Sequence, residues 1–246
     1  MTRIGIAGYR GRQGARWIGE VAYAEQTDVP YKRESMSADE WLADCRRVII
    51  ATPIAAHVEL ARAALRAGKP VLCEKPLALT FQQVAQLYEV AQRYWTRLWV
   101  AYPHLWHPSV EAMAKLPGKI DVEITFCGPT NAEPVLDWAP HALSAALYIL
   151  GFDAQLVTWT ANEARTKVQM VLANERGRAW LEFGLSPVKR TRIQTKSPSR
   201  LYYTGENTHP TTMQRMLQAW LKNEPDPRGD PALTLGVHEL LDEVLP

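Results

Sequence analysis

The 246-residue sequence predicts an α/β protein, with a doubly wound parallel sheet first and an α+β region with a mostly antiparallel open sheet after it. Strands and helices alternate through the first part, which favours right-handed crossovers and a parallel sheet. A glycine-rich turn joins the first strand to the first helix. In the second part, apolar and polar residues alternate with a period of two, which marks strands with one buried face. We therefore expect two domains, residues 1–103 and 104–246.

The first domain starts with a short apolar strand at residues 3–7, followed by a helix at 15–24. Ser37 and Glu40 have the spacing of a capping box and predict the start of a second helix. Residues 47–52 are predicted to form a strand with an apolar centre, as expected in a parallel sheet that is covered on both faces. The remaining elements are predicted as a helix at 57–67 ended by Gly68, a strand at 70–73, a helix at 80–94 capped by Thr80, and a strand at 98–102.

The second domain contains strands with one apolar face, predicted at residues 120–126, 168–172 and 179–185. Residues 141–150 form an apolar helix between strands, and Gly151 ends it. Two more helices, at 212–221 and 233–245, close the chain.

The composition is that of an ordinary globular protein, with 47% hydrophobic and 22% charged residues. The net charge is only +2, and the basic residues are scattered, which argues against a nucleic-acid partner. No run approaches the roughly 18 apolar residues of a membrane span, and the first residues lack the pattern of a signal peptide. Three cysteines stand far apart and predict reduced thiols. We expect a cytoplasmic protein with no membrane partner.

The turn after the first strand contains Gly8, Gly11 and Gly14 in a G-x-x-G-x-x-G pattern, one residue wider than the usual first gap. Between a strand and a helix, such glycines let the backbone approach a pyrophosphate, and the helix N-terminus attracts its charge. Arg10 and Arg12 either neutralise phosphate charge or belong to a solvated loop.

A dinucleotide fold normally places an acidic residue about 20 residues further on, where it holds the adenosine ribose. No clear apolar strand precedes Asp28, so the second strand and its helix are predicted to be shortened or deleted. Without that acid, and with arginines and lysines nearby in the sequence, NADP is slightly favoured over NAD. Weakened cofactor binding is the alternative.

Three sequence blocks follow one another along the chain. They are Ala51-Thr52-Pro53 with His57, Glu74-Lys75-Pro76 after Gly68-Lys69-Pro70-Val71, and Asp137-Trp138-Ala139-Pro140-His141. A weaker fourth block spans residues 100–108. Their order and spacing resemble the Gfo/Idh/MocA oxidoreductase family, which includes glucose–fructose oxidoreductase and inositol dehydrogenase. The resemblance implies a Rossmann-like first domain, and this chain is shorter than typical members.

The resemblance assigns catalytic roles to Lys75, Asp137 and His141. Lys75 would hydrogen-bond the substrate oxygen and help to move its proton, His141 would be the general base, and Asp137 would orient the substrate or His141. His57 is interpreted as structural, and His104 is a further candidate for ligand contact. The predicted cofactor-binding residues are Gly8, Arg10, Gly11, Arg12, Gln13, Thr52, Pro53, Glu74 and Tyr102.

The leading hypothesis is an NAD(P)-dependent oxidoreductase that transfers a hydride between the nicotinamide and a small hydroxyl, carbonyl or imine substrate. The resemblance implies a sugar- or cyclitol-like molecule and a homodimer or homotetramer formed through the open sheet face, to which Trp159 and Trp180 would belong. The alternative is a non-catalytic relative that acts as a ligand-sensing or scaffold protein. The shortened nucleotide domain and the wide glycine turn favour this alternative, whereas Lys75, Asp137 and His141 oppose it.

Overall fold

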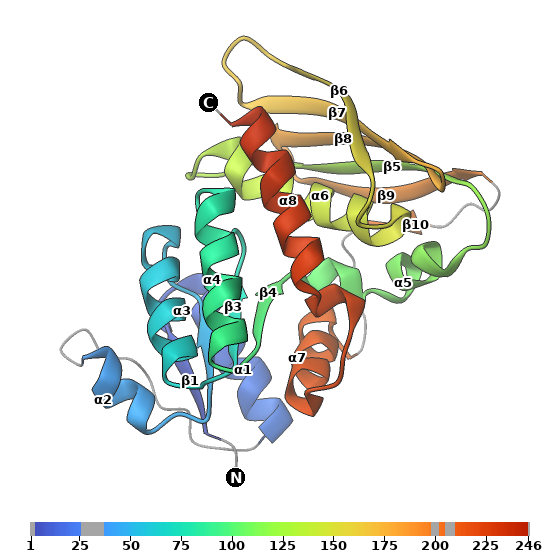
Figure 1. The fold of residues 1–246 in the computed structure, drawn as a ribbon. Helices are drawn as coiled ribbons and strands as arrows, with labels where there is room; N and C mark the ends of the chain where they lie inside the picture. The colour runs from blue at the N-terminus through green and yellow to red at the C-terminus, as the bar shows by residue number, and fades with distance from the viewer. Residues whose placement is uncertain (1–2, 26–36, 198–201, 205–209, 246) are drawn as a thin grey trace. The chain divides into compact units, whose positions relative to one another are not determined.

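The computed structural model describes residues 3–25, 37–197, 202–204 and 210–245 (Figure 1). The chain divides into two compact units. The first unit consists of Met1–Ala101 with Met213–Pro231, and the second of Tyr102–Thr212 with Ala232–Pro246. The first unit thus includes a segment near the C-terminus that the sequence analysis placed in the second domain.

The first unit is built on a parallel sheet with the strand order β1-β2-β3-β4. Its strands are β1 (Ile4–Ala7), β2 (Arg47–Ile50), β3 (Val71–Glu74) and β4 (Leu98–Ala101). Its helices are α1 (Arg12–Glu25), α2 (Ala38–Ala43), η1 (Ile54–Ala56), α3 (His57–Arg66), α4 (Phe81–Arg93), α7 (Thr212–Lys222) and η3 (Pro227–Gly229). The alternation predicted from the sequence is confirmed, and each strand is almost fully buried, as expected for a covered parallel sheet.

Helices cover both faces of this sheet. On one face, Trp41 of α2 and Cys45 occupy the space into which a side chain at Gly5 would project. The opposite face carries Glu74, which bonds to Trp17 of α1. Glu74 is paired with Ala101 of β4, and Trp99 lies two residues before Ala101, so Trp99 and Glu74 share one face of the sheet. Trp99 packs on Gly229 of η3. The sheet is therefore doubly wound, with α3 and α4 side by side in Figure 1.

Local signals set the helix ends of the first unit. Ser37 and Glu40 form both bonds of the predicted capping box at the start of α2. The Thr80 side chain accepts a hydrogen bond from the backbone N–H of Gln83 at the start of α4. Gly68 follows α3 with a φ of 69°, a left-handed conformation that favours glycine. The predicted loss of a strand after α1 concerns residues 26–36, which lie outside the described residues.

The second unit contains a six-stranded sheet with the order β10-β9-β5-β8-β7-β6. Its strands are β5 (Ile120–Gly128), β6 (Gln155–Ala161), β7 (Lys167–Asn174), β8 (Gly177–Leu185), β9 (Arg190–Ser197) and β10 (Tyr202–Tyr203). Its helices are η2 (Pro103–Trp106), α5 (Pro108–Lys115), α6 (Pro134–Leu150) and α8 (Pro231–Val244). The sheet is mostly antiparallel, as predicted, but its central pair β5–β8 is parallel.

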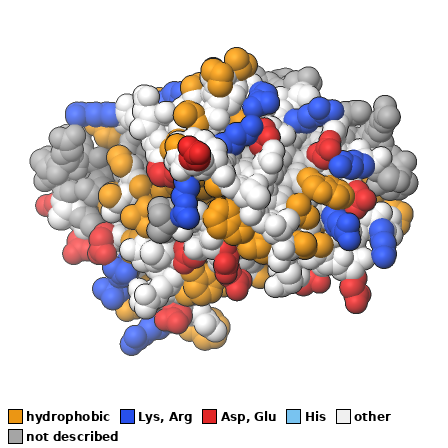
Figure 2. Space-filling view, turned by 90° about the horizontal axis from the view of Figure 1, so that it is seen from above, with side chains coloured by type: hydrophobic (Ala, Val, Ile, Leu, Met, Phe, Trp, Pro, Cys, Tyr) orange, Lys and Arg blue, Asp and Glu red, His pale blue; other side chains and the backbone are white. Residues whose placement is uncertain are grey.

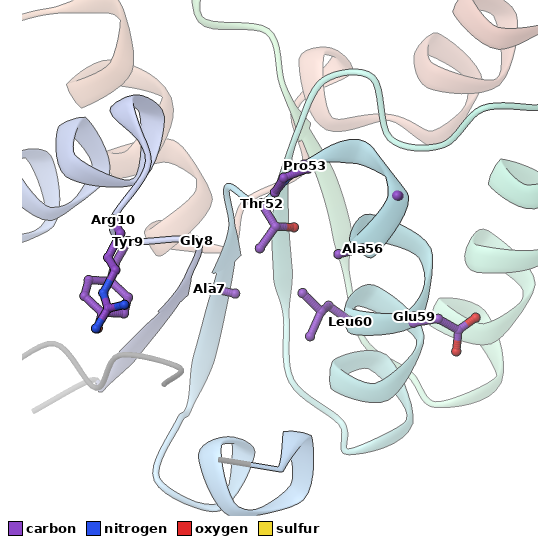
Figure 3. A pocket seen from close by; sticks show the side chains of 10 residues that line it. Ala7, Gly8, Tyr9, Arg10, Thr52, Pro53, Ala56, Glu59 and Leu60 are labelled. Atoms are coloured by element: carbon purple, nitrogen blue, oxygen red, sulfur yellow. The ribbon is translucent and has the colours of Figure 1, made fainter. Parts of the chain in front are cut away.

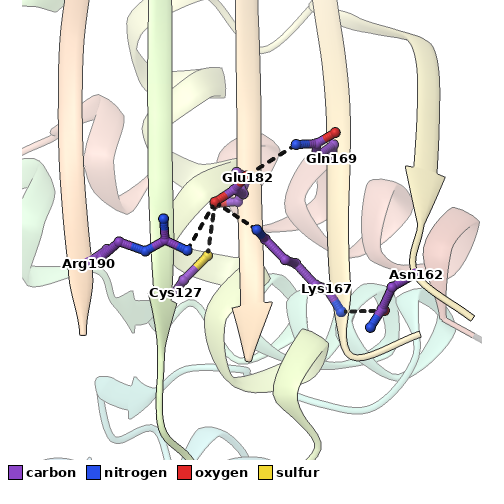
Figure 4. A network of polar contacts seen from close by, with 6 residues as sticks. All are labelled: Cys127, Asn162, Lys167, Gln169, Glu182 and Arg190. Carbon is purple, nitrogen blue, oxygen red and sulfur yellow. Dashed lines mark hydrogen bonds and ion pairs between the residues drawn. The ribbon is translucent and has the colours of Figure 1, made fainter. Parts of the chain in front are cut away.

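One face of this sheet packs against α6 and the other carries polar side chains. On the polar face, Glu182 accepts from Gln169 at 3.1 Å and pairs with Lys167 at 3.1 Å and Arg190 at 3.5 Å (Figure 4). Burial opposes the ionisation of Glu182, but these hydrogen bonds and charges outweigh it and lower the pKa of the carboxyl. Seen from above, basic, acidic and hydrophobic side chains are interspersed (Figure 2).

Helix α1 begins at Arg12 and not at residue 15 as predicted, and the start of α6 differs more. Helix α6 begins at Pro134 and not at His141, because the Glu133 side chain caps the free N–H groups of Val135 and Leu136. Pro134 suits the first helical position, where no N–H is needed. Helix α5 and strands β6, β9 and β10 were not predicted. Among the described residues, no helix has the length and apolar character needed to cross a membrane.

Candidate functional site

The glycine turn is shaped by close backbone approaches. Gly8 has a φ of +83°, and a Cβ there would lie 2.4 Å from the carbonyl oxygen of Ala51. A Cβ on Gly14 would lie 2.2 Å from the carbonyl oxygen of Gly8. At Gly11, in contrast, the nearest atom would be the Gly8 oxygen at 3.4 Å, which is an ordinary contact. The fold therefore requires glycine at positions 8 and 14. It does not require glycine at position 11, where the backbone is bare and exposed.

A pocket of about 570 Å³ opens beside this turn (Figure 3). Gly8, Tyr9 and Arg10 line one side, and the residues on the other side follow β2. These are Thr52, Pro53, Ala55, Ala56, Glu59 and Leu60. The Thr52 hydroxyl is buried and has no hydrogen-bond partner among the described residues.

This lining fits a nucleotide. The N-terminus of α1 carries no acidic residue in its first turn, so its free N–H groups suit a phosphate. The Tyr9 ring and the apolar side chains of Pro53 and Leu60 suit the flat face of a base, and the partnerless Thr52 hydroxyl has hydrogen-bonding capacity left for a ligand. The structure thus gathers four of the predicted cofactor-binding residues, Gly8, Arg10, Thr52 and Pro53, around one pocket.

Gln13 and Glu74, two predicted cofactor-binding residues, contact each other. The Gln13 amide nitrogen lies 3.4 Å from Oε1 of Glu74, and Nε1 of Trp17 donates to the same oxygen at 2.8 Å. Burial raises the pKa of the Glu74 carboxyl, and the Trp17 bond and the Lys75 charge oppose this shift. Glu74 therefore ties α1 to the end of β3. The sequence did not predict the part that Trp17 plays here.

His57 connects two of the predicted site segments. Its Nδ1 lies 2.9 Å from the carbonyl oxygen of Pro76, and its Nε2 lies 2.8 Å from that of Thr52. Burial lowers the pKa of His57, although both backbone bonds act in the other direction. Lys75, half-buried, directly precedes Pro76, and the bond between them is cis. His57 thus has the structural role expected of it, because it holds the Lys75-Pro76 turn to the Thr52 turn.

Helix α6 carries the remaining predicted catalytic residues. Asp137 and His141 are four residues apart, so they lie on one face of the helix, and both are half-buried. Oδ2 of Asp137 accepts from the Thr130 hydroxyl at 2.7 Å. The Trp138 ring lies against Gly128 and has its centroid 6.2 Å from that of His141.

His104 is part of the same cluster, and the sequence analysis left its role open. Its side chain is only 4% exposed. Nδ1 of His104 lies 3.4 Å from Nδ1 of His141, and Nε2 lies 3.2 Å from the Ser144 hydroxyl. Phe126 stacks on His141 and meets His104 edge-on. Only the packing of η2 on α6 reveals this cluster, and no local signal marks Ser144.

The predicted catalytic residues belong to different units. Lys75 lies in the first, and Asp137 and His141 lie in the second, which begins with the buried Tyr102. In the described part of the chain, no group of three or more His, Cys, Asp or Glu side chains is arranged to hold a metal ion.

The sequence and structure of this chain are similar to those of known oxidoreductases. Residues 4–102 match the model of the oxidoreductase family with an NAD-binding Rossmann fold. The chain is 29% identical to an inositol 2-dehydrogenase from Rhizobium meliloti over 142 residues, which are 52% of this chain and 43% of that protein. It is 27% identical to dTDP-3,4-didehydro-2,6-dideoxy-alpha-D-glucose 3-reductase from Actinomadura kijaniata over 196 residues, 70% of this chain and 59% of the reductase. The chain thus matches less than two thirds of the length of these curated relatives.

Solved structures share the fold over almost the whole chain. A dehydrogenase from Clostridium difficile has a TM-score of 0.83 at 13% identity and covers 99% of this chain and 98% of its own. A mutant 3-ketoreductase from Actinomadura kijaniata, in complex with TDP-benzene and NADP, has a TM-score of 0.81 at 20% identity and covers 99% of this chain and 96% of its own. At these identities the likeness shows the fold of both units. Residues 4–102 are thus similar to the Gfo/Idh/MocA family of oxidoreductases.

Proposed function

We propose that this protein is an NAD(P)-dependent oxidoreductase that transfers a hydride between the nicotinamide and a small hydroxyl, carbonyl or imine substrate. The observation that carries this proposal is the pocket beside the glycine turn. The pocket is lined by Gly8, Arg10 and Thr52, whose hydroxyl has no partner among the described residues. The same turn continues through the bare backbone of Gly11 into the N-terminus of α1. These are the features that a dinucleotide requires, and they occur in the part of the chain that the family model matches.

The bound cofactor would supply the hydride chemistry, and the chain would supply binding, orientation and proton handling. In the oxidative direction the cofactor would take up the hydride, and residues of the chain would have to accept the proton of the substrate hydroxyl. We assign the proton to Lys75 and His141, and the orientation of substrate hydroxyls to Asp137. A lysine donates to a substrate oxygen when charged, and a histidine accepts and returns a proton near neutral pH.

The relatives support a substrate class. The inositol dehydrogenase is named for a cyclitol and the reductase for a nucleotide-linked keto sugar. For this chain we propose a sugar- or cyclitol-like substrate. Asp137 and His141, four residues apart on α6, have the polar groups to bind neighbouring hydroxyls.

For the cofactor we slightly favour NADP over NAD. Arg10 lines the nucleotide pocket, and its guanidinium lies 5.6 Å from the centroid of the Tyr9 ring. A guanidinium at this position can pair with a ribose 2′-phosphate, which only NADP carries. Solved relatives have been crystallised with NADP and with NAD.

The test is a calorimetric titration of the purified chain with NADPH and then with NADH. We expect one nucleotide per chain with micromolar affinity. Gly11→Ala is tolerated by the turn but obstructs the approach of a pyrophosphate, so it should weaken binding by about tenfold or more. Gly19→Ala, on α1 with open space around it, is the matched control and should bind as the native chain does.

If neither nucleotide binds, the oxidoreductase proposal is wrong. The alternative, a non-catalytic ligand-sensing or scaffold protein, then takes its place. Equal affinities for Gly11→Ala and the native chain would show that the glycine turn is not the phosphate site.

We further propose that the chain forms a homodimer or homotetramer through the polar face of the six-stranded sheet. Trp180 lies on this face, paired with Glu123, and lines a shallow pocket that also contains Arg192. Trp159 is paired with the buried Met170 and therefore lies on the opposite face of the sheet. A half-buried tryptophan on an open sheet face is typical of protein interfaces. Light scattering at micromolar concentration should give at least twice the chain mass, and a monomer would exclude this assembly.

A further inference from the structure

The Ser144 hydroxyl determines the direction of a chain of hydrogen bonds that ends at His141. Ser144 is fully buried on α6, and its Oγ lies 2.6 Å from the carbonyl oxygen of Pro140, 3.3 Å from that of His141 and 3.2 Å from Nε2 of His104. A carbonyl oxygen only accepts, so the single hydroxyl hydrogen is donated to a carbonyl, and the nearer one is Pro140. The hydroxyl must therefore accept from Nε2–H of His104.

This assignment also determines which ring nitrogens of His104 and His141 carry a hydrogen. A neutral imidazole carries one hydrogen, so a His104 that is protonated on Nε2 has an unprotonated Nδ1. That nitrogen lies 3.4 Å from Nδ1 of His141, and two unprotonated nitrogens would repel each other there. His141 is therefore the donor, with its hydrogen on Nδ1, and its Nε2 carries the lone pair that can take a proton.

The surroundings keep both rings in place. Phe126 is parallel to the His141 ring, at 19° and 5.3 Å between centroids, and lies edge-on to His104 at 5.2 Å. His104 is 4% exposed and Ser144 is 0% exposed, so bulk water does not compete for these bonds.

We propose that Ser144 and His104 are positioning residues that hold His141 in the Nδ1–H tautomer and so make Nε2 its basic nitrogen. The partner at Nδ1 is a neutral imidazole and not a carboxylate. When Nε2 of His141 accepts a proton, Nδ1–H stays donated to His104, and no proton moves along the chain. The tautomer follows from the geometry alone, and its catalytic use rests on the proposed function.

The test is long-range ¹H–¹⁵N correlation NMR on the full chain labelled at histidine, above the pH at which His141 is protonated. The peaks are assigned with single-histidine variants. We expect a protonated Nδ1 and an unprotonated Nε2 for His141, and the reverse for His104. This measurement needs no cofactor and no substrate. A His141 with its proton on Nε2 overturns the proposal, whatever the protein catalyses.

A variant separates positioning from packing. Ser144→Ala removes the acceptor for Nε2–H of His104 with little change in volume, so both rings should become mixtures of tautomers. Ser186→Ala deletes another buried serine hydroxyl of the same unit and should leave both tautomers unchanged. Unchanged His141 nitrogen shifts in Ser144→Ala would contradict the role of Ser144.

Activity is the second measurement. With a substrate in hand, Ser144→Ala should lower kcat by about tenfold, because much of His141 would carry its proton on the wrong nitrogen, and should leave cofactor affinity unchanged. If NMR shows the expected tautomers but no substrate is turned over, the positioning chain is established and the oxidoreductase proposal is the one that fails.

Discussion

Lys75 combines a charged side chain with a location at the carboxyl end of β3, where open α/β sheets bind ligands. Lys75→Met keeps most of the side-chain length and removes the ammonium group. If Lys75 handles the substrate proton, kcat/KM should fall by about 100-fold to 10,000-fold, whereas NAD(P)H affinity should stay within about threefold of the native value. Steady-state kinetics measure kcat/KM, and calorimetry measures the affinity for NAD(P)H.

Lys69→Met is the control for this prediction, because Lys69 lies before the same strand and outside the predicted site. It should keep native kinetics. A Lys75→Met variant that loses cofactor binding and turnover together would show that Lys75 holds the turn in place and does not act on the substrate.

At the scale of single residues, the sequence was informative where a residue type has few roles. Gly8 adopts a positive φ, which favours glycine, and Thr52 lines the pocket beside the glycine turn. The hydrogen bond from Trp17 to Glu74 was not predictable, because it joins residues 57 positions apart. An apolar helix face predicts that Trp17 is buried, but it does not predict which carboxyl group accepts from the indole N–H.

At the scale of elements, Arg47 holds α7 to the first unit. Its guanidinium donates to the carbonyl oxygens of Trp220 and Leu221, at 3.1 Å each, in the last turn of α7. The same group lies 5.4 Å from the centroid of the Trp220 ring. The Trp220 carbonyl also accepts from the backbone N–H of Asn223 at 3.2 Å. Carbonyl groups in the last turn of a helix lack the usual partner four residues on, so a cation at this end stabilises the helix.

Arg47→Ala should therefore lower the free energy of unfolding by about 1–3 kcal/mol, because two carbonyl groups lose a charged donor. Chemical denaturation measures this change. Arg46→Ala, on the exposed neighbouring residue, should change stability by less than about 0.5 kcal/mol. Equal effects of the two substitutions would show that α7 does not depend on Arg47.

Helix α6 shows how far element boundaries can be read from the sequence. Its apolar centre was predicted at residues 141–150, but its first turns, which contain Pro134 and Pro140, were not predicted. In the structure, Pro134 occupies the first helical position and Glu133 caps the N-terminus. Asp137 therefore lies inside the helix, and its spacing from His141 is that of one helical face.

At the scale of the whole molecule, His238 should make stability depend on pH. It is fully buried in α8, and neither ring nitrogen has a hydrogen-bond partner among the described residues. Burial lowers the pKa of His238 from 6.5 to about 4. The unfolded chain then binds a proton that the folded chain does not, so stability is fully present above pH 6.5 and is lost as the pH falls toward 4.

Between pH 7.5 and 5, this group alone should cost about 2 kcal/mol. His238→Leu removes the titration, so the native chain should lose that much more stability than the variant over this range. Denaturant unfolding of both proteins at each pH gives the difference between their free energies of unfolding. Titrating groups that both proteins contain, including His57, cancel in this difference. Parallel pH profiles would show that His238 is not buried as a neutral ring.

The sequence alone was enough to predict the parallel sheet, the mostly antiparallel sheet, the glycine turn and the Lys75 turn, because each depends on a local pattern or a short motif. Three features required the tertiary structure, namely the Trp17–Glu74 bond, the cluster of His104, His141 and Ser144, and the place of α7 in the first unit. Each joins residues that lie far apart in the chain or assigns an amphipathic helix to one of two cores. The hydrophobic pattern says that such a helix face is buried, but only packing selects its partner.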